Sequence, residues 1–290
     1  MAIQKGSIMK FGGMSERCGR MFRAVRWTIA SLLCIAVCVQ GSAAYAAGSS
    51  APGFTSGLPV YAIFPKGLYY LNQTQSTHRD VGDVEIRSNT ESLFFYYQSD
   101  IKFAEGTLAF VLIPTLFDIT TTNGLNDFGF YNTYFAVQES WEIGDGLYFG
   151  VRLGGYIPQG DNLSLPYGTI EPRFGVTYLK DGWQATANMV FGFPLGGNEA
   201  DFAPNYFLTD LSITKSIGKW TVGPVAHAST DLGTPFSGYQ RQSQFALGGM
   251  IGYDLGSATV QAKITRDVTE TNYGGKETAF WTNLLIPIKF

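Results

Sequence analysis

The strongest constraint on this sequence is a pattern that recurs from about residue 60 to its end. Runs of roughly 10 to 15 residues alternate apolar and polar side chains, and we count about twelve of them. Alternation with a period of two is typical of β-strands that have one apolar face. No window of about ten residues in this region has the pattern of an amphipathic helix. The sequence therefore predicts an all-β fold.

The connections between the runs alternate between tight turns and longer loops. Five connections are tight and contain Gly, several with an adjacent Asp, as hairpins with positive φ require: 103–106, 142–146, 180–182, 216–219 and 254–257. Six are longer: 77–83, 121–126, 158–168, 196–204, 232–240 and 271–277. Short turns at one end and long loops at the other, with an even number of strands, are typical of bacterial outer-membrane barrels.

Composition favours a membrane barrel over a soluble β-sandwich, which would show the same alternation. Charged residues make up 15% of the chain where about 25% is usual, and aromatic residues also reach 15%. Sandwich strands are commonly about 5–6 residues long, shorter than these runs. Trp141, Trp183, Trp220 and Tyr253 lie near run ends, as interfacial girdles do. We expect a transmembrane antiparallel up-and-down β-barrel of about twelve strands.

Residues 1–46 have the features of a secretory signal peptide. Six Lys or Arg residues precede the apolar stretch Trp27–Val39, and Ala44–Ala46 offers a cleavage site with small residues. The apolar stretch is shorter than the roughly 20 residues of a membrane-spanning helix. All three cysteines lie in this segment, so the remaining chain has no thiol. Translation could start at any of three methionines: Met1, Met14 or Met21.

The remaining chain divides into a flexible leader, 47–58, and a barrel, 59–290. Removal of the signal takes away six basic residues and one acidic residue, which leaves a net charge near −8. That charge argues against a nucleic-acid partner. The expected partners are outer-membrane lipids, the barrel-assembly machinery and small hydrophobic or aromatic solutes.

The alternation assigns one face of several strands to the lipid. In 147–157, Leu147, Phe149 and Val151 share a row opposite Tyr148 and Arg152. An Arg that faces lipid at mid-membrane costs about 2–4 kcal/mol, so Arg152 and Arg173 should face the lumen. The runs 84–101 and 107–120 alternate poorly.

The last run places Leu284, Ile286, Ile288 and Phe290 in one row. We expect this row to face outward, and Trp281, Asn283 and Lys289 to face the lumen. A final strand that ends on an outward Phe resembles the closing strand of bacterial outer-membrane barrels, where it also serves assembly. Phe290 and Ile288 are therefore the expected assembly signal, on a strand that pairs with about 60–74.

Several short motifs, in order, resemble one Gram-negative family. They are Gly154–Asp161, Glu171–Tyr178 followed by Asp181–Asn188, Leu211–Trp220 and Gly248–Gly256. The family is that of the meta-pathway of phenol degradation, outer-membrane proteins also described as transporters. The resemblance covers about 60–290, with Gln159 where the family pattern has Thr. It implies a barrel that passes small hydrophobic or aromatic compounds inward, without enzymatic activity in ring cleavage. We expect neither an enzyme nor a cofactor.

The candidate solute path consists of polar and aromatic residues in the predicted lumen: Tyr148, Arg152, Tyr156, Glu171, Arg173, Asp210 and His227. The charges of Arg152, Glu171 and Arg173 could set a selective constriction. They could equally form a structural ion-pair network that fills a narrow barrel. Tyr148 and Tyr156, together with Tyr206, would offer apolar solutes an aromatic surface.

Two other functions remain open. His227, Ser229 and Asp231 share one face of a run and could belong to an outer-membrane hydrolase, but neighbours on that face stand about 7 Å apart, too far for a triad on one strand. A structural or adhesive barrel would predict longer outer loops. His78, Asp80 and Asp83 are scattered in a polar stretch, and no metal-ligand spacing or cofactor motif occurs. The solute, and whether the leader plugs the lumen, are not determined by the sequence.

Overall fold

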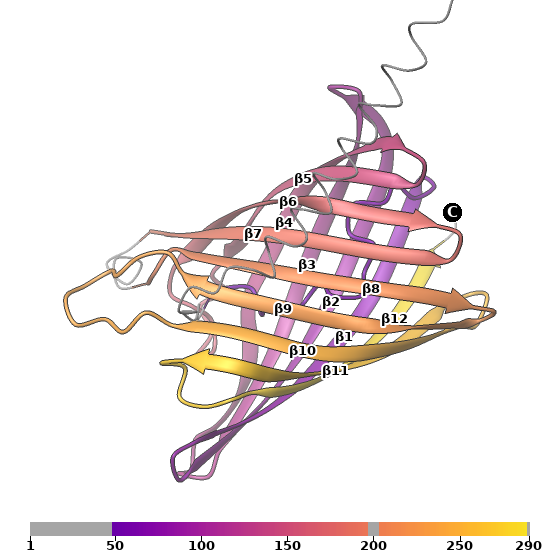
Figure 1. Ribbon diagram of the computed structural model, residues 1–290. Helices are drawn as coiled ribbons and strands as arrows, with labels where there is room; N and C mark the ends of the chain where they lie inside the picture. The colour runs from indigo at the N-terminus through magenta and orange to yellow at the C-terminus, as the bar shows by residue number, and fades with distance from the viewer. Residues whose placement is uncertain (1–47, 197–202, 289–290) are drawn as a thin grey trace, which may run out of the picture. The chain divides into compact units, whose positions relative to one another are not determined.

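The chain forms a closed antiparallel barrel of twelve strands (Figure 1), which confirms the predicted fold class and strand number. This computed structural model describes residues 48–196 and 203–288. Each strand pairs with its neighbours in sequence, and β1 closes the ring by pairing with β12. The strands are β1 Gly67–Val81, β2 Val84–Phe103, β3 Gly106–Thr121, β4 Asn126–Gly144, β5 Leu147–Ile157, β6 Gly168–Lys180, β7 Trp183–Leu195, β8 Tyr206–Ile217, β9 Trp220–Asp231, β10 Ser243–Asp254, β11 Thr259–Thr271 and β12 Thr278–Ile288.

The five predicted tight turns all join an even-numbered strand to the next odd-numbered one, at one end of the barrel. Between β6 and β7 the turn consists of Asp181 and Gly182, whose φ angles are 52° and 72°. Positive φ at both central residues matches the right-handed twist of the paired strands, and Asp and Gly tolerate it. We call this end of the barrel the turn side and the other end the loop side.

The prediction of a long loop at 77–83 is wrong. Strand β1 continues to Val81 and β2 begins at Val84, so only Gly82 and Asp83 form the connection. Strands β1 to β4 are 15, 20, 16 and 19 residues long, against 11 to 13 for the other eight. Their loop-side ends carry polar side chains on both faces, for example Thr77 paired with Ser88. That explains why alternation is weak there.

The first half of the final strand has the predicted orientation, whereas Leu284, Ile286 and Ile288 of the expected outward row are half-buried. Trp281 and Asn283 are buried, whereas Phe280 is exposed on the outer face. Lys289 and Phe290 lie outside the described residues. At the turn side, the ring of Trp220, which begins β9, packs against Tyr253 near the end of β10, with 4.7 Å between ring centroids. Among the described residues there is no helix long and apolar enough to cross a membrane.

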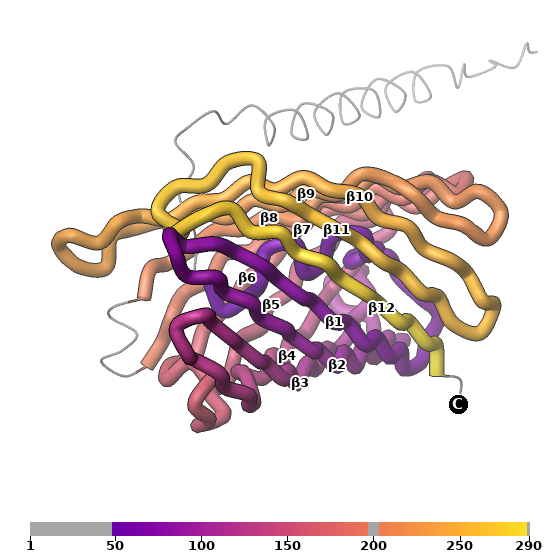
Figure 2. The backbone as a smooth tube through the Cα atoms, turned by 90° about the horizontal axis from the view of Figure 1, so that it is seen from below, coloured from indigo at the N-terminus to yellow at the C-terminus, as the bar shows by residue number. Residues whose placement is uncertain are grey.

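Residues 48–64 lie inside the barrel (Figure 2), whereas the sequence suggested a flexible leader for 47–58. Most side chains from Ser49 to Ala62 are buried. The backbone folds into successive turns, in which the N–H groups of Phe54, Ser56 and Leu58 each donate to the carbonyl three residues earlier. Small residues that suggest flexibility in an isolated peptide allow this compact path inside a barrel. We call residues 48–64 the lumenal segment.

Candidate functional site

Asp210 of β8 holds the lumenal segment by three hydrogen bonds. Its carboxylate accepts from the backbone N–H of Gly53 and of Thr55, each at 2.7 Å, and from Thr55 Oγ1 at 2.6 Å. Asp210 is 2% exposed. Hydrogen bonds from backbone N–H groups to a buried carboxylate are stronger than those between neutral groups. Asp210 is therefore the main anchor of the turn at 53–55.

Lys263 of β11 binds the carbonyl groups of the same turn. Its ammonium donates to Gly53 O at 2.5 Å and to Ser56 O at 3.0 Å, and it lies 4.2 Å from the centroid of the Trp281 ring. The backbone turn thus lies between an anion that accepts from its N–H groups and a cation that donates to its carbonyls. His227 of β9 approaches so closely that a Cβ at Gly53 would lie 2.6 Å from His227 Nδ1.

Glu171 and Arg173 of β6 form a buried ion pair that also holds the beginning of the segment. The hydroxyl of Ser50 donates to Glu171 Oε2 at 3.0 Å and accepts from Arg173 Nη2 at 2.8 Å. The Tyr206 hydroxyl donates to the other Glu171 oxygen, and Ser50 also bonds the Tyr156 hydroxyl at 2.8 Å. This network supports the interpretation of these charges as a structural ion pair, because Glu171 and Arg173 bind each other and the lumenal segment.

The end of the segment is bound by neutral side chains. Tyr61 is fully buried and its hydroxyl donates to Asn188 Oδ1 at 2.7 Å. Gln138 Nε2 donates to Val60 O at 3.0 Å, and Gln184 Nε2 donates to Gly57 O at 2.9 Å. Strands β4 and β7 therefore also hold the segment.

A cavity of about 200 Å³ lies above the segment on the loop side. We call it the loop-side cavity. Its floor is made by residues 48–52 and Phe54. Its lining combines hydroxyl groups with aromatic rings: Ser88, Thr90, Ser92 and Thr115, and Phe117, Tyr131, Tyr156 and Tyr273. Glu277 also lines it, paired with Arg79 at 2.5 Å, and burial raises the pKa of Glu277 despite this pairing.

A second cavity, of about 260 Å³, lies on the turn side of the segment and is mainly apolar. We call it the turn-side cavity. Its apolar lining comes from both the segment and the wall, and it contains one charged residue, Arg152. The lining side chains include Leu58, Val60, Leu71, Phe94, Tyr96 and Val111.

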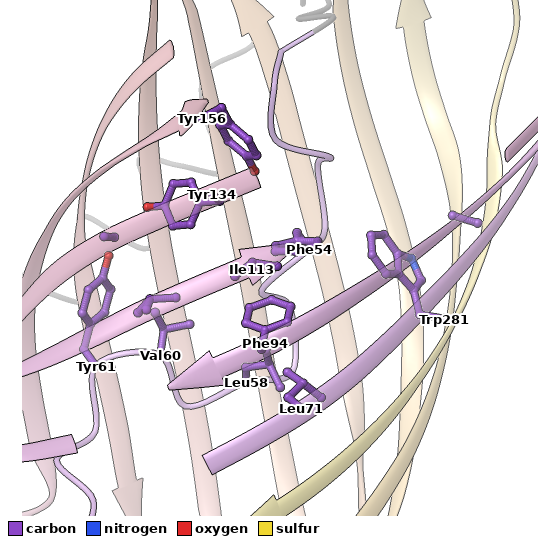
Figure 3. Close-up of a cluster of buried hydrophobic side chains, with 13 residues drawn as sticks. Phe54, Leu58, Val60, Tyr61, Leu71, Phe94, Ile113, Tyr134, Tyr156 and Trp281 are labelled. Carbon is purple, nitrogen blue, oxygen red and sulfur yellow. The ribbon is translucent and has the colours of Figure 1, made fainter. Parts of the chain in front are cut away.

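Two stacked rings lie between the cavities. Phe54 lines the loop-side cavity, Phe94 of β2 lines the turn-side cavity, and their ring centroids are 4.9 Å apart (Figure 3). Trp281 contacts the Phe54 ring edge-on, with centroids 6.5 Å apart. The aromatic side chain of one segment residue thus forms part of the partition across the lumen.

The structure places six of the seven candidate residues in the buried lumen: Arg152, Tyr156, Glu171, Arg173, Asp210 and His227. Tyr148 is half-buried and lies next to the turn-side end of β5, away from both cavities. Arg152 lies opposite Arg173 in the β5–β6 register, but its guanidinium donates to Gln138 rather than joining the Glu171 pair. The expected charge cluster is therefore divided in two.

Ser229 and Asp231 bind separate partners, and His227 Nδ1 has no hydrogen-bond partner among the described residues. Ser229 Oγ donates to Gln244 Oε1 at 3.2 Å, and Asp231 accepts from the Tyr239 hydroxyl at 2.7 Å. No hydrogen bond joins any two of the three among the described residues. The described part of the chain also has no group of three or more His, Cys, Asp or Glu side chains arranged to hold a metal.

Sequence reasoning missed Lys263, Gln138 and Phe94, along with the lumenal segment that they contact. Lys263 lies on a polar row of β11 with Gln261 and Thr265, so alternation alone could have placed it in the lumen. No local signal indicates its partners, because Gly53 is 210 residues away in the chain.

Comparison with known families identifies the chain. Residues 71–284 match the family described as "Putative MetA-pathway of phenol degradation". The chain belongs to this family. The match spans β1 to β12 and agrees with the resemblance seen in the sequence motifs. No curated protein matches the sequence of this phenol-degradation family member.

Solved structures show the same fold. The COG4313 outer membrane channel from Pseudomonas putida F1 superposes with a TM-score of 0.66 at 11% identity, over 79% of this chain and 98% of that one. The translocator domain of the autotransporter NalP from Neisseria meningitidis gives a TM-score of 0.47 at 12% identity, over 79% of this chain and 91% of that one. The likeness to the COG4313 channel, at 11% identity, shows that this family member has the same barrel fold.

Proposed function

We propose that this protein is an outer-membrane channel for the uptake of small hydrophobic or aromatic compounds. The observation that carries the proposal is the pair of cavities on opposite sides of the lumenal segment, one lined by hydroxyl groups and rings and the other mainly apolar. Ligand sites are typically concave and mostly apolar, with a few polar groups that orient the ligand. The phenol-degradation family and the fold shared with an outer membrane channel support the same function.

Passage requires the lumenal segment to move, because it fills the lumen between the cavities. Solutes would enter the loop-side cavity, contact the aromatic wall and cross when the partition at Phe54 opens. The segment is held by hydrogen bonds and packing, and no covalent bond links it to the wall in the described residues. Such contacts can break and re-form on the timescale of loop motions.

A reversible cross-link tests whether segment motion opens the channel. The Ser49 and Thr169 hydroxyl oxygens lie 2.6 Å apart, so Ser49→Cys with Thr169→Cys should form a disulfide between segment and wall. All native cysteines lie in the first 38 residues, so no other thiol lies in the barrel. In planar bilayers we expect the oxidised variant to lose its ion conductance and to regain it on reduction.

The matched control joins two wall strands without touching the segment. Ser216 and Thr221 face each other across β8 and β9, with hydroxyl oxygens 3.0 Å apart. Ser216→Cys with Thr221→Cys should conduct equally when oxidised and reduced. Phenol added on the loop side should shorten the open events in a concentration-dependent manner. A reduced channel that neither conducts nor responds to phenol would contradict the proposal.

A further inference from the structure

One buried cation in the lumen lacks a counter-ion. Arg152 is 5% exposed and lies on the inward row of β5. It takes part in none of the ion pairs found among the described residues. Its Nε and Nη2 groups donate to a single neutral acceptor, Gln138 Oε1, at 2.9 and 2.5 Å. The Tyr134 hydroxyl also lies close to Arg152, so the polar neighbours of this positive charge are neutral groups rather than a carboxylate.

The neighbouring arginine, Arg173, has the carboxylate partner that Arg152 lacks. Arg173 lies opposite Arg152 in the β5–β6 register, is equally buried, and is paired with Glu171. Burial of a charge costs several kcal/mol unless a partner compensates for the lost hydration. Buried charges in proteins are accordingly paired with an opposite charge or coordinate a metal. Arg152 departs from that rule, and it does so where it borders a cavity.

Most of the remaining lining of the turn-side cavity is apolar. Leu58 and Val60 of the lumenal segment, with Leu71, Phe94 and Val111 of the wall, surround a volume of about 260 Å³. Ligand sites commonly begin at about 300 Å³, so a small molecule suits this cavity best. A ligand complementary to this lining has one anionic group and an apolar body.

We propose that the turn-side cavity binds a small organic monocarboxylate, with its carboxylate on Arg152 and its apolar body against Phe94 and Leu71. A guanidinium presents several N–H donors in one plane and matches a carboxylate in bidentate geometry. Gln138 occupies Nε and one donor of Nη2, which leaves other N–H groups of Arg152 available. The apolar wall favours a ring or a short alkyl chain over a second charge.

The inference deepens the proposed function and rests on it for the route by which a ligand reaches the cavity. The loop-side cavity, with hydroxyl groups and rings, accepts neutral solutes, whereas the cavity beyond Phe54 selects for negative charge. The binding site itself can be tested in the purified barrel, whether or not the protein conducts.

Calorimetric titration of the detergent-purified barrel with benzoate, benzyl alcohol and benzylammonium tests the proposal. We expect benzoate to bind at one site per chain, and the other two to bind at least about tenfold more weakly, as expected when one partner of a buried charge pair is absent. Arg152→Met should weaken benzoate binding by about tenfold or more. Arg152→Lys should retain part of the affinity, because it keeps the charge without the bidentate geometry.

Arg87→Met is the matched control, since Arg87 is exposed on the outer face of β2. It should bind benzoate like the unaltered protein. Heat-dependent gel mobility confirms that each variant is a folded barrel, and Arg152→Lys serves if Arg152→Met does not fold. Equal binding of benzoate and benzyl alcohol, or benzoate binding unchanged in both Arg152 variants, would overturn the inference. Loss of conductance with intact, Arg152-dependent benzoate binding would contradict the transport proposal alone.

Discussion

The ring of Phe54 lies on the ring of Phe94, with centroids 4.9 Å apart and planes 25° from parallel. Phe54 comes from the lumenal segment and Phe94 from the wall, so the contact joins the two parts of the molecule that must separate for a solute to pass. A stacked pair of this kind contributes about 0.5–1.5 kcal/mol beyond its buried area. That contribution is small enough for thermal opening and large enough for substitution to alter it.

Replacement of Phe54 by Ala should increase conductance. The change removes the ring that separates the two cavities and leaves the hydrogen bonds of Gly53 and Thr55 to Asp210 intact. We expect longer open events in planar bilayers, by severalfold. Phe280→Ala on the exposed outer face of β12 is the control and should leave conductance unchanged. Unaltered open times in Phe54→Ala would show that the ring is no barrier.

Replacement of Asp210 by Asn should loosen the lumenal segment. The amide keeps one acceptor oxygen but places an NH₂ group towards donors that now bind the second oxygen. Hydrogen bonds to charged groups contribute about 1.5–3 kcal/mol, so the amides of residues 53–55 should exchange with deuterium about tenfold faster or more. Mass spectrometry of the peptide that covers 48–61 measures this. Asp254→Asn, in the β10–β11 turn region, should leave that peptide unaffected.

Replacement of Asp161 by Ala should release the loop between β5 and β6. Strand β4 extends beyond the end of β5, and the Asp161 carboxylate accepts from the N–H of Phe130 at that free edge, at 3.1 Å. Limited proteolysis should cut 158–167 several times faster, with a stability loss of about 1 kcal/mol. Gly129→Ala should have the same effect, because a Cβ there would lie 2.5 Å from Asp161 Oδ1. Resistance of both variants to the protease would refute this role.

Glu277 should make the barrel less stable at alkaline pH. Burial raises the pKa of Glu277 in the folded protein, so the folded state holds this proton more tightly than the unfolded state does. Its contribution is therefore fully present below the unfolded pKa and is lost as the pH rises through the folded pKa. Glu277→Gln should raise the thermal midpoint relative to the unaltered protein at pH 8 and have little effect at pH 4. The opposite order would show that the ion pair with Arg79 dominates.

The wall of the barrel could be predicted from the sequence because its rules are local. Alternation in β5 assigned the inward row correctly, and the residue types of Asp181 and Gly182 identified a tight turn. The hairpin of β1 and β2 was cut short because its loop-side end has polar residues on both faces. In that region backbone hydrogen bonds hold the two strands together, but neither face is apolar, so the sequence shows no alternating pattern.

The contents of the lumen could not be predicted, because they depend on contacts between distant parts of the chain. Asp210 and Arg152 were identified as lumenal, but their different roles follow from partners at Gly53 and Gln138. The segment around Gly53 consists of small residues that suit many conformations, and only the surrounding wall selects one. Alternation of apolar and polar residues indicates which face of a strand a side chain occupies. It does not indicate which other lumenal side chains that residue contacts.

The position of the lumenal segment also constrains the order of barrel assembly. The segment precedes β1, yet its anchors Asp210 and Lys263 lie on β8 and β11, which are synthesised more than 150 residues later. The β1–β12 ladder, from Leu68 with Ile288 to His78 with Thr278, closes the ring around it. The lumenal segment can therefore form these contacts only after β8 and β11 are in place. A docked segment thus indicates that the later strands of the barrel have been added.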